Sequence, residues 1–192
     1  MNKLDNKENI LKISLELFAE RGYNSVGIQE IVDKAKITKP TLYHYYGNKR
    51  GLLEAIFKNY YVEMIERLKL AGNYQGDLIK TLEDLVHEYF NYALGNKEFF
   101  YLRLSMSFVP VSNETYSMIE PYHKELSNFL ISLFKSSLQE HGNLKGHEDI
   151  LAKTLMGILN HYALELVNGS LEKTEELVYK VVKQYMYGIY VL

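Results

Sequence analysis

Residues 34–50 combine positive charge with aromatic rings. The stretch contains five basic residues and no acid, and Tyr43, His44, Tyr45 and Tyr46 follow one another within it. Basic side chains attract phosphate, and Tyr and His can hydrogen-bond to phosphate oxygens while packing on sugars. The stretch therefore predicts a local contact with a polyanion, and a solvated basic loop is the alternative.

The sequence has no recognisable catalytic or metal-binding pattern. It contains no cysteine, and neither HExxH, GxSxG nor a phosphate-binding loop occurs. His141 with His147, or Glu54 with Glu63, could be imagined as site pairs, but neither pair has a further partner at a defined spacing. We therefore expect no catalytic residue, no metal and no cofactor, with an all-α enzyme as the alternative.

Charge is distributed unevenly along the 192 residues. Residues 1–71 hold 12 basic and 9 acidic residues, whereas residues 72–192 hold 10 and 15, which gives a net charge of -2. The N-terminus has no apolar signal core, and no run of 18 apolar residues occurs. These features predict a cytoplasmic protein without a membrane span, whose basic patch lies in its N-terminal part.

Apolar residues recur at helical spacing throughout, and no convincing alternating strand occurs. We expect an all-α protein. Asp5 with Glu8 offers a capping box for the first helix, Thr38 and Asn48 are expected N-caps, and Pro40 falls in a first turn where its missing N–H costs nothing. The segment 109–120 is expected to be irregular or to hold one turn. The helices are expected at about 6–21, 28–35, 38–46, 49–71, 77–94, 97–107, 121–141, 147–168 and 172–191.

The second and third expected helices are separated by a turn of two or three residues, which predicts a helix-turn-helix. Leu42 and Tyr46 are assigned to its core, facing Ile31, Val32 and Ile37, so the other flank of the third helix is left for DNA. Tyr45 fits either the core or the edge of the groove. The predicted DNA contacts are Lys36, Thr38, Lys39, Pro40, Thr41, Tyr43, His44, Tyr45, Asn48 and Lys49.

Residues 10–56 resemble the N-terminal domain of the TetR family of bacterial transcriptional regulators. The matching pieces are ILKISLELFAERGYNSVGIQEIV, DKAKIT and KPTLYHYYGNKRGLL. Several positions depart from the family pattern. Gly27 replaces a capping hydroxyl, Arg50 and Gly51 replace acidic positions, and Tyr46 replaces Phe. Lys36 stands where Gly is common, so a strained conformation is expected there.

The resemblance implies a homodimer that binds a palindromic operator, usually as a repressor, and a C-terminal domain that binds an effector. An activator or a partner-protein binder is the alternative. The predicted domains are 1–47 for DNA binding, 48–71 as a connecting helix, and 72–192 for effector binding and dimerisation.

The last two expected helices are strongly apolar and contain small residues that allow close approach. A four-helix bundle with a second copy is implied by the resemblance, and from the residues alone an intrachain core is equally possible. The expected interface residues are Leu155, Ile158, Leu159, Tyr162, Val178, Val182, Tyr185 and Ile189.

The middle of the chain is rich in aromatic residues, which could line a cavity for an apolar or aromatic effector or belong to the core. Arg103 is the only arginine after residue 67. Facing inward it would bind an anionic ligand, but we expect it on the surface in an ion pair. The candidate pocket residues are Tyr92, Arg103, Met106, Tyr122, His123, Phe129 and His161.

Overall fold

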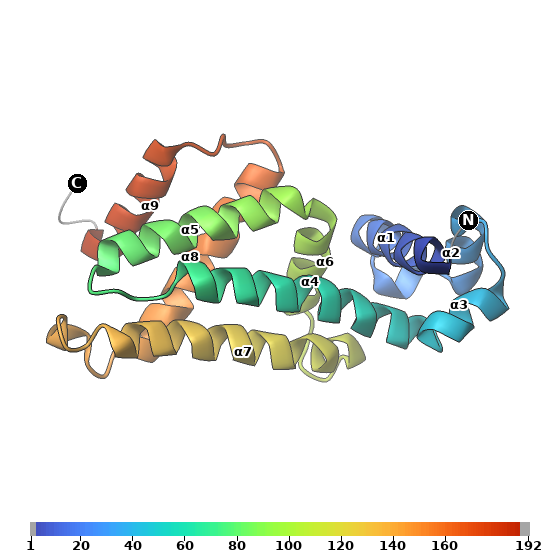
Figure 1. Ribbon diagram of the computed structural model, residues 1–192, viewed down its shortest axis with the longest axis horizontal. Helices are drawn as coiled ribbons and strands as arrows, with labels where there is room; N and C mark the ends of the chain where they lie inside the picture. The colour runs from blue at the N-terminus through green and yellow to red at the C-terminus, as the bar shows by residue number, and fades with distance from the viewer. Residues whose placement is uncertain (1–2, 189–192) are drawn as a thin grey trace. The chain divides into compact units, whose positions relative to one another are not determined.

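The computed structural model describes residues 3–188, with side chains from residue 6 onward, and this part of the chain contains helices and no strand. The prediction of an all-α fold is confirmed. Figure 1 labels the α-helices and colours the chain from its N-terminus to its C-terminus. Two short 3-10 helices, η1 and η2, accompany the α-helices. The elements are α1 (Lys3–Arg21), η1 (Tyr23–Ser25), α2 (Ile28–Ala35), α3 (Lys39–Tyr46), α4 (Lys49–Ala71), α5 (Leu78–Gly95), α6 (Lys97–Ser107), α7 (Glu114–Ser136), η2 (Gly142–Leu144), α8 (Glu148–Val167) and α9 (Glu175–Tyr187).

Two expected helix starts were wrong. Helix α1 begins at Lys3, so Asp5 lies inside the helix instead of capping it. Helix α7 begins at Glu114, because Asn113 Oδ1 accepts the Thr115 N–H at 2.9 Å and so caps the helix. Pro121 therefore lies inside a helix that also buries residues of the segment expected to be irregular.

Other boundaries also moved by a few residues. Helix α7 ends at Ser136, five residues before its expected end, and α9 begins at Glu175 because the Thr174 hydroxyl accepts the Leu177 N–H at 3.1 Å. The last residues of the expected final helix lie outside the described part of the chain.

The chain packs as two compact units. The first contains Met1–Val62 and Glu98–Glu120, and the second contains Glu63–Lys97 and Pro121–Leu192. Residues 98–120 therefore pack with the N-terminal residues, far from them in sequence. The functional domain boundaries predicted above stay a prediction, because packing units need not coincide with functional domains.

The core of the first unit contains the helices of the helix-turn-helix and an aromatic cluster between α4 and α6. The Phe99 ring contacts Phe57 and Tyr61 in edge-to-face geometry, with centroids 6.5 and 5.7 Å apart, and stacks on Tyr60 at 5.3 Å. Ile31 and Leu42 are completely buried. Burial of Ile31 and Leu42 stabilises the packing of α2 against α3, whose other side stays exposed.

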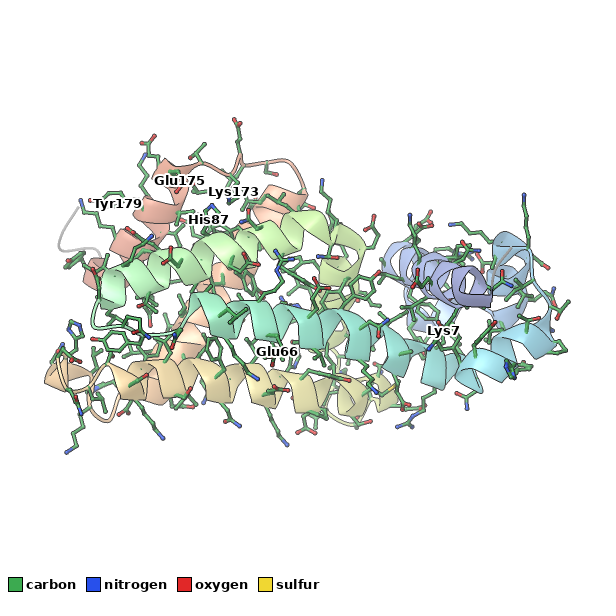
Figure 2. All side chains as sticks on the ribbon, viewed as in Figure 1. Lys7, Glu66, His87, Lys173, Glu175 and Tyr179 are labelled. Carbon is green, nitrogen blue, oxygen red and sulfur yellow. The ribbon has the colours of Figure 1, made fainter. Side chains whose placement is uncertain are left out.

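In the second unit, α5 packs against both α8 and α9. Figure 2 shows His87 of α5 close to Lys173, which precedes α9, and to Glu175, the first residue of α9. His87 Nε2 lies 2.9 Å from Lys173 Nζ and 3.4 Å from Glu175 Oε1. Polar contacts thus join the start of α9 to α5.

None of the described helices combines the length and the apolar character that a membrane span requires. Within the same part of the chain, no group of three or more His, Asp or Glu side chains is arranged to hold a metal ion.

Candidate nucleic-acid interface

The turn between α2 and α3 is held by one residue in the left-handed conformation. Lys36 has φ 54° and ψ 45° and is the C-cap of α2, where its N–H donates to the Asp33 carbonyl at 3.2 Å. The Ile37 N–H donates to the Val32 carbonyl at 3.0 Å. A side chain in this region is sterically disfavoured, so the expected strain at Lys36 is confirmed. The turn directs the Lys36 side chain to solvent.

Helix α3 has one buried and one exposed side. Its N-cap is Thr38, whose Oγ1 accepts the Thr41 N–H at 3.4 Å, and Pro40 lies in the first turn, as expected. Leu42 is fully buried, as predicted. The exposed side carries Lys39, Pro40, Tyr43 and His44, while Thr41 and Tyr45 are partly exposed.

Tyr46 lies half-buried at the end of α3 and ties this helix to α1. Its hydroxyl donates to the carbonyl of Lys7 at 2.7 Å (Lys7 is labelled in Figure 2). Burial, with smaller contributions from Glu8 and Tyr45, raises the pKa of Tyr46 to about 12. The prediction that Tyr46 belongs to the core is thus corrected: it is a partly exposed anchor to α1.

The basic residues of 34–50 fall into two groups. Lys34 pairs with Glu16 at 3.3 Å, and Arg50 pairs with Glu54 and Glu114 at 2.9 and 3.0 Å. The other three form no ion pair with a described residue; they are Lys36, Lys39 and Lys49. Their charges lie at the turn, at the start of α3 and at the start of α4, and no nearby carboxylate cancels them.

The start of α4 adds its own positive potential. Asn48 is the N-cap, as expected, since its Oδ1 accepts the Gly51 N–H at 2.9 Å. Only its amide nitrogen therefore remains for a phosphate. Lys49 follows directly, and its charge adds to that of the helix dipole.

Two residues near this surface were missed by the sequence reasoning. Lys49 Nζ lies 4.3 Å from the centroid of the Tyr23 ring, and the backbone at Gly51 closely approaches the end of α3. Tyr23 lies within the first of the matching pieces quoted above, but nothing in its spacing relates it to Lys49.

The candidate effector residues have different environments. Arg103 is only 2% exposed, so the expectation of a surface position was wrong; its guanidinium carbon lies 5.0 Å from the Phe100 ring centroid and 5.9 Å from that of Tyr61. Met106 is buried in the same unit.

In the second unit, Tyr92 is buried and Tyr122 and His123 are partly exposed. Phe129 lines an open pocket of about 580 Å³. His161 is exposed on α8. A single effector pocket containing all seven candidates stays a prediction.

The expected interface residues divide by burial. Four of them are at most 3% exposed within the single chain, and they are Leu155, Leu159, Val178 and Val182. A partner could bury almost no additional area on these four. Ile158, Tyr162 and Tyr185 are partly exposed, and the Tyr185 hydroxyl donates to the Leu151 carbonyl at 2.9 Å. Ile189 lies outside the described residues.

Comparison with known proteins supports the fold and the helix-turn-helix. A family model described as bacterial regulatory proteins of the tetR family matches residues 10–56. The Transposon Tn10 TetC protein of Escherichia coli is 28% identical over 157 residues, which cover 79% of this chain and 75% of TetC. Residues 10–56 of the chain thus match the DNA-binding domain of the TetR family.

Other TetR-like proteins match over most of their length. The regulator YvdT of Bacillus subtilis, described as an uncharacterized HTH-type transcriptional regulator, is 25% identical over 90% of this chain and 88% of its own. The crystal structure of FadR from Bacillus subtilis, in complex with stearoyl-CoA, superimposes with a TM-score of 0.78 at 20% identity, covering 95% and 98% of the two chains. This TetR-family chain is a DNA-binding transcriptional regulator of the helix-turn-helix type.

Proposed function

We propose that this TetR-family regulator is a homodimeric repressor that binds a palindromic operator and is released by a small-molecule effector. The observation that carries the DNA-binding part is the charge pattern around α3. Lys36, Lys39 and Lys49 have no carboxylate partner among the described residues, whereas the neighbouring Lys34 and Arg50 do. Action on chromosomal DNA would place the protein in the cytoplasm.

The residues of the surface divide into base and phosphate contacts. Lys39 and Thr41, at the N-terminal end of α3, are proposed to reach base edges in the major groove, with Pro40 packed against them. Tyr43 and His44 lie farther along the exposed side and are proposed to contact phosphate or sugar. Tyr45, partly exposed, is proposed at the edge of the groove.

The residues that flank α3 complete the phosphate contacts. The Lys36 side chain and the Thr38 hydroxyl lie at the N-terminal end of α3, and Asn48 and Lys49 lie at the start of α4. Amide and hydroxyl donors with lysine charges at helix N-termini are typical phosphate contacts.

Dimerisation is proposed through the outer faces of α8 and α9. These helices expose Ile150, Tyr179 and Tyr187 by 62%, 52% and 47%, and Ile158 and Tyr162 of α8 are partly exposed. A second copy would bury this apolar surface. Two recognition helices about 34–36 Å apart would then read half-sites in successive major grooves.

The effector is proposed to be apolar or aromatic with an anionic group. The FadR structure from Bacillus subtilis contains stearoyl-CoA, so a long-chain acyl-CoA is the first candidate. Arg103, buried against the rings of Phe100 and Tyr61, is the proposed contact for the anionic group. The remaining proposed pocket residues are Tyr92, Met106, Tyr122, His123, Phe129 and His161.

The first test measures binding to a fluorescent duplex that the wild-type protein selects from a random-sequence library, called the selected duplex below. Binding at two salt concentrations should weaken with salt and survive excess random DNA. Lys49→Ala should reduce the salt slope by about 1, as for a phosphate contact, while Lys39→Ala should also change the preferred sequence. Lys58→Ala is the matched control, because Lys58 is exposed on α4 and forms no ion pair with a described residue.

A second test separates repression from activation. A promoter carrying the selected duplex is fused to a reporter and measured with and without the protein. Lower output with the protein supports a repressor, and higher output would replace it with an activator. Stearoyl-CoA added to the purified complex should release the duplex; a complex that resists it would exclude this candidate effector.

A further inference from the structure

The aromatic pair Phe18 and Tyr23 forms a platform at the end of α1. Gly22 follows the helix with φ 79°, a conformation that L side chains rarely adopt, and the chain then reverses into η1. This reversal places the Tyr23 ring edge-on to the completely buried Phe18 ring, with centroids 5.2 Å apart and an interplanar angle of 67°. Packing on Phe18 therefore fixes the Tyr23 ring.

The ammonium group of Lys49 lies over this platform. Its Nζ is 4.3 Å from the Tyr23 centroid and 5.9 Å from that of Phe18. A cation at this distance from a ring face is attracted by the ring quadrupole. Burial lowers the pKa of the Lys49 ammonium, and burial together with Glu114 raises the pKa of the Tyr23 hydroxyl. The Tyr23 ring therefore stays neutral at physiological pH.

The adjacent cation at the start of α4 is held in a different way. Arg50 makes ion pairs with Glu54 and Glu114, and their carboxylates offset its charge. Lys49 forms no ion pair with a described residue, so the aromatic rings hold it without cancelling its charge. A carboxylate in the place of Tyr23 would also orient the lysine, but it would remove the net charge that attracts phosphate.

We propose that Tyr23 is a positioning residue for DNA binding: its ring holds the Lys49 ammonium at the start of α4 for a backbone phosphate. The inference rests on the proposed function, which assigns Lys49 to that phosphate. A free lysine side chain loses rotamer freedom when it binds, and contact with the ring restricts those rotamers before DNA arrives. Tyr23 thus acts through Lys49 without itself touching DNA.

The test is a double-mutant cycle on the selected duplex, with Tyr23→Leu, Lys49→Met and the double variant, together with Tyr23→Phe. Dissociation constants are measured by fluorescence anisotropy. Tyr23→Leu should weaken binding about 2- to 5-fold, the range of an exposed cation–π contact. In the Lys49→Met background the same change should have no effect, because its partner is gone. Tyr23→Phe keeps the ring and should bind like the wild type.

A matched cycle separates positioning from a purely structural role. The changes in binding free energy caused by Tyr23→Leu and Lys39→Ala should add in the double variant, since Lys39 has no contact with the ring. Replacing Tyr23 with trifluorophenylalanine keeps the shape of the aromatic ring but weakens its quadrupole. This variant should therefore lose as much affinity for the duplex as Tyr23→Leu does. This second variant keeps the test decisive if Tyr23→Leu does not fold, which circular dichroism reports.

Three outcomes would overturn the proposal, and they can be told apart. If Lys49→Met leaves affinity and salt slope unchanged, the phosphate contact in the proposed function fails as well. If Lys49→Met weakens binding but Tyr23→Leu adds its full effect to it, positioning fails and the phosphate contact stands. If Tyr23→Phe lowers the affinity for the selected duplex as much as Tyr23→Leu does, the hydroxyl is the active group and the ring has no positioning role.

Discussion

Gly51 lies where the chain leaves α3 and starts α4, and replacing it tests how tightly this corner is packed. A Cβ atom built on Gly51 would lie 2.1 Å from the carbonyl oxygen of Tyr46 and 3.3 Å from its carbonyl carbon. The same oxygen accepts the Asn48 N–H at 2.8 Å. The obstacle is backbone, so no side-chain rotation can relieve the clash in Gly51→Ala.

The size of the effect follows from that distance. Ordinary contacts between a carbon and a carbonyl oxygen are about 3.3 Å or longer, so the end of α3 must move by roughly 1 Å. Overpacking of this kind costs about 1–3 kcal/mol of unfolding free energy. At about 2–4 °C per kcal/mol for a chain of this size, Gly51→Ala should lower the melting temperature by about 2–12 °C.

DNA binding should suffer as well, because the displaced end belongs to the helix proposed to read bases. We expect Gly51→Ala to weaken binding to the selected duplex by about tenfold or more. Gly95→Ala is the matched control, since no atom lies within 4 Å of its added methyl group. Thermal melting by circular dichroism and anisotropy are the two assays. A Gly51→Ala protein that melts and binds like the wild type would refute the close packing of this corner.

Three further predictions concern other parts of the chain. Lys36→Gly should raise the unfolding free energy by about 1 kcal/mol, because glycine relieves the left-handed strain. The same change should weaken DNA binding, because it removes a positive charge. Thermal melting measures the first effect and fluorescence anisotropy the second. Gly157→Leu, at a position open in the single chain, should prevent dimerisation while helical content is kept, and sedimentation equilibrium would detect an unaffected dimer. Because the folded pKa of Tyr46 is about 12 against 10.0 for the free side chain, its contribution to stability is present below pH 10 and lost towards pH 12. The free energy of unfolding, measured with denaturant, should therefore fall less steeply between pH 10 and pH 12 for Tyr46→Phe than for the wild type. An equal fall in both proteins would contradict a hydroxyl that is stabilised in its neutral form.

The helix-turn-helix was predictable because its determinants are local. Thr38, Pro40 and Asn48 mark helix starts through bonds to backbone groups a few residues away, and such bonds can be read from spacing alone. The family pattern over residues 10–56 indicated a TetR-like regulator, because that pattern also consists of residues close together in the sequence. Lys36 was expected to be strained because it stands where Gly is common in the family pattern.

Predictions from local sequence were wrong where tertiary packing determined the outcome. Pro121 suggested an irregular segment before it, but Asn113 starts α7 earlier and the added turns bury Met118 and Ile119. Arg103 was expected at the surface because arginine usually lies there, yet it packs against aromatic rings of its own unit. A single charged residue in an apolar helix has no periodic signal that reveals its direction.

The sequence by itself determined the all-α class, the helix-turn-helix and the place of the positive charge, since all three depend on residues close together in the chain. Only the tertiary structure decided which charges stay uncancelled. Glu114 lies far along the chain from Arg50, and Glu16 lies in a different helix from Lys34, so ion pairing could not be read from spacing. Tyr23 of η1 and Lys49 at the start of α4 are likewise brought together only by the fold. Coulomb and ring–cation forces act over a few ångströms of space, and the fold alone determines which residues come that close.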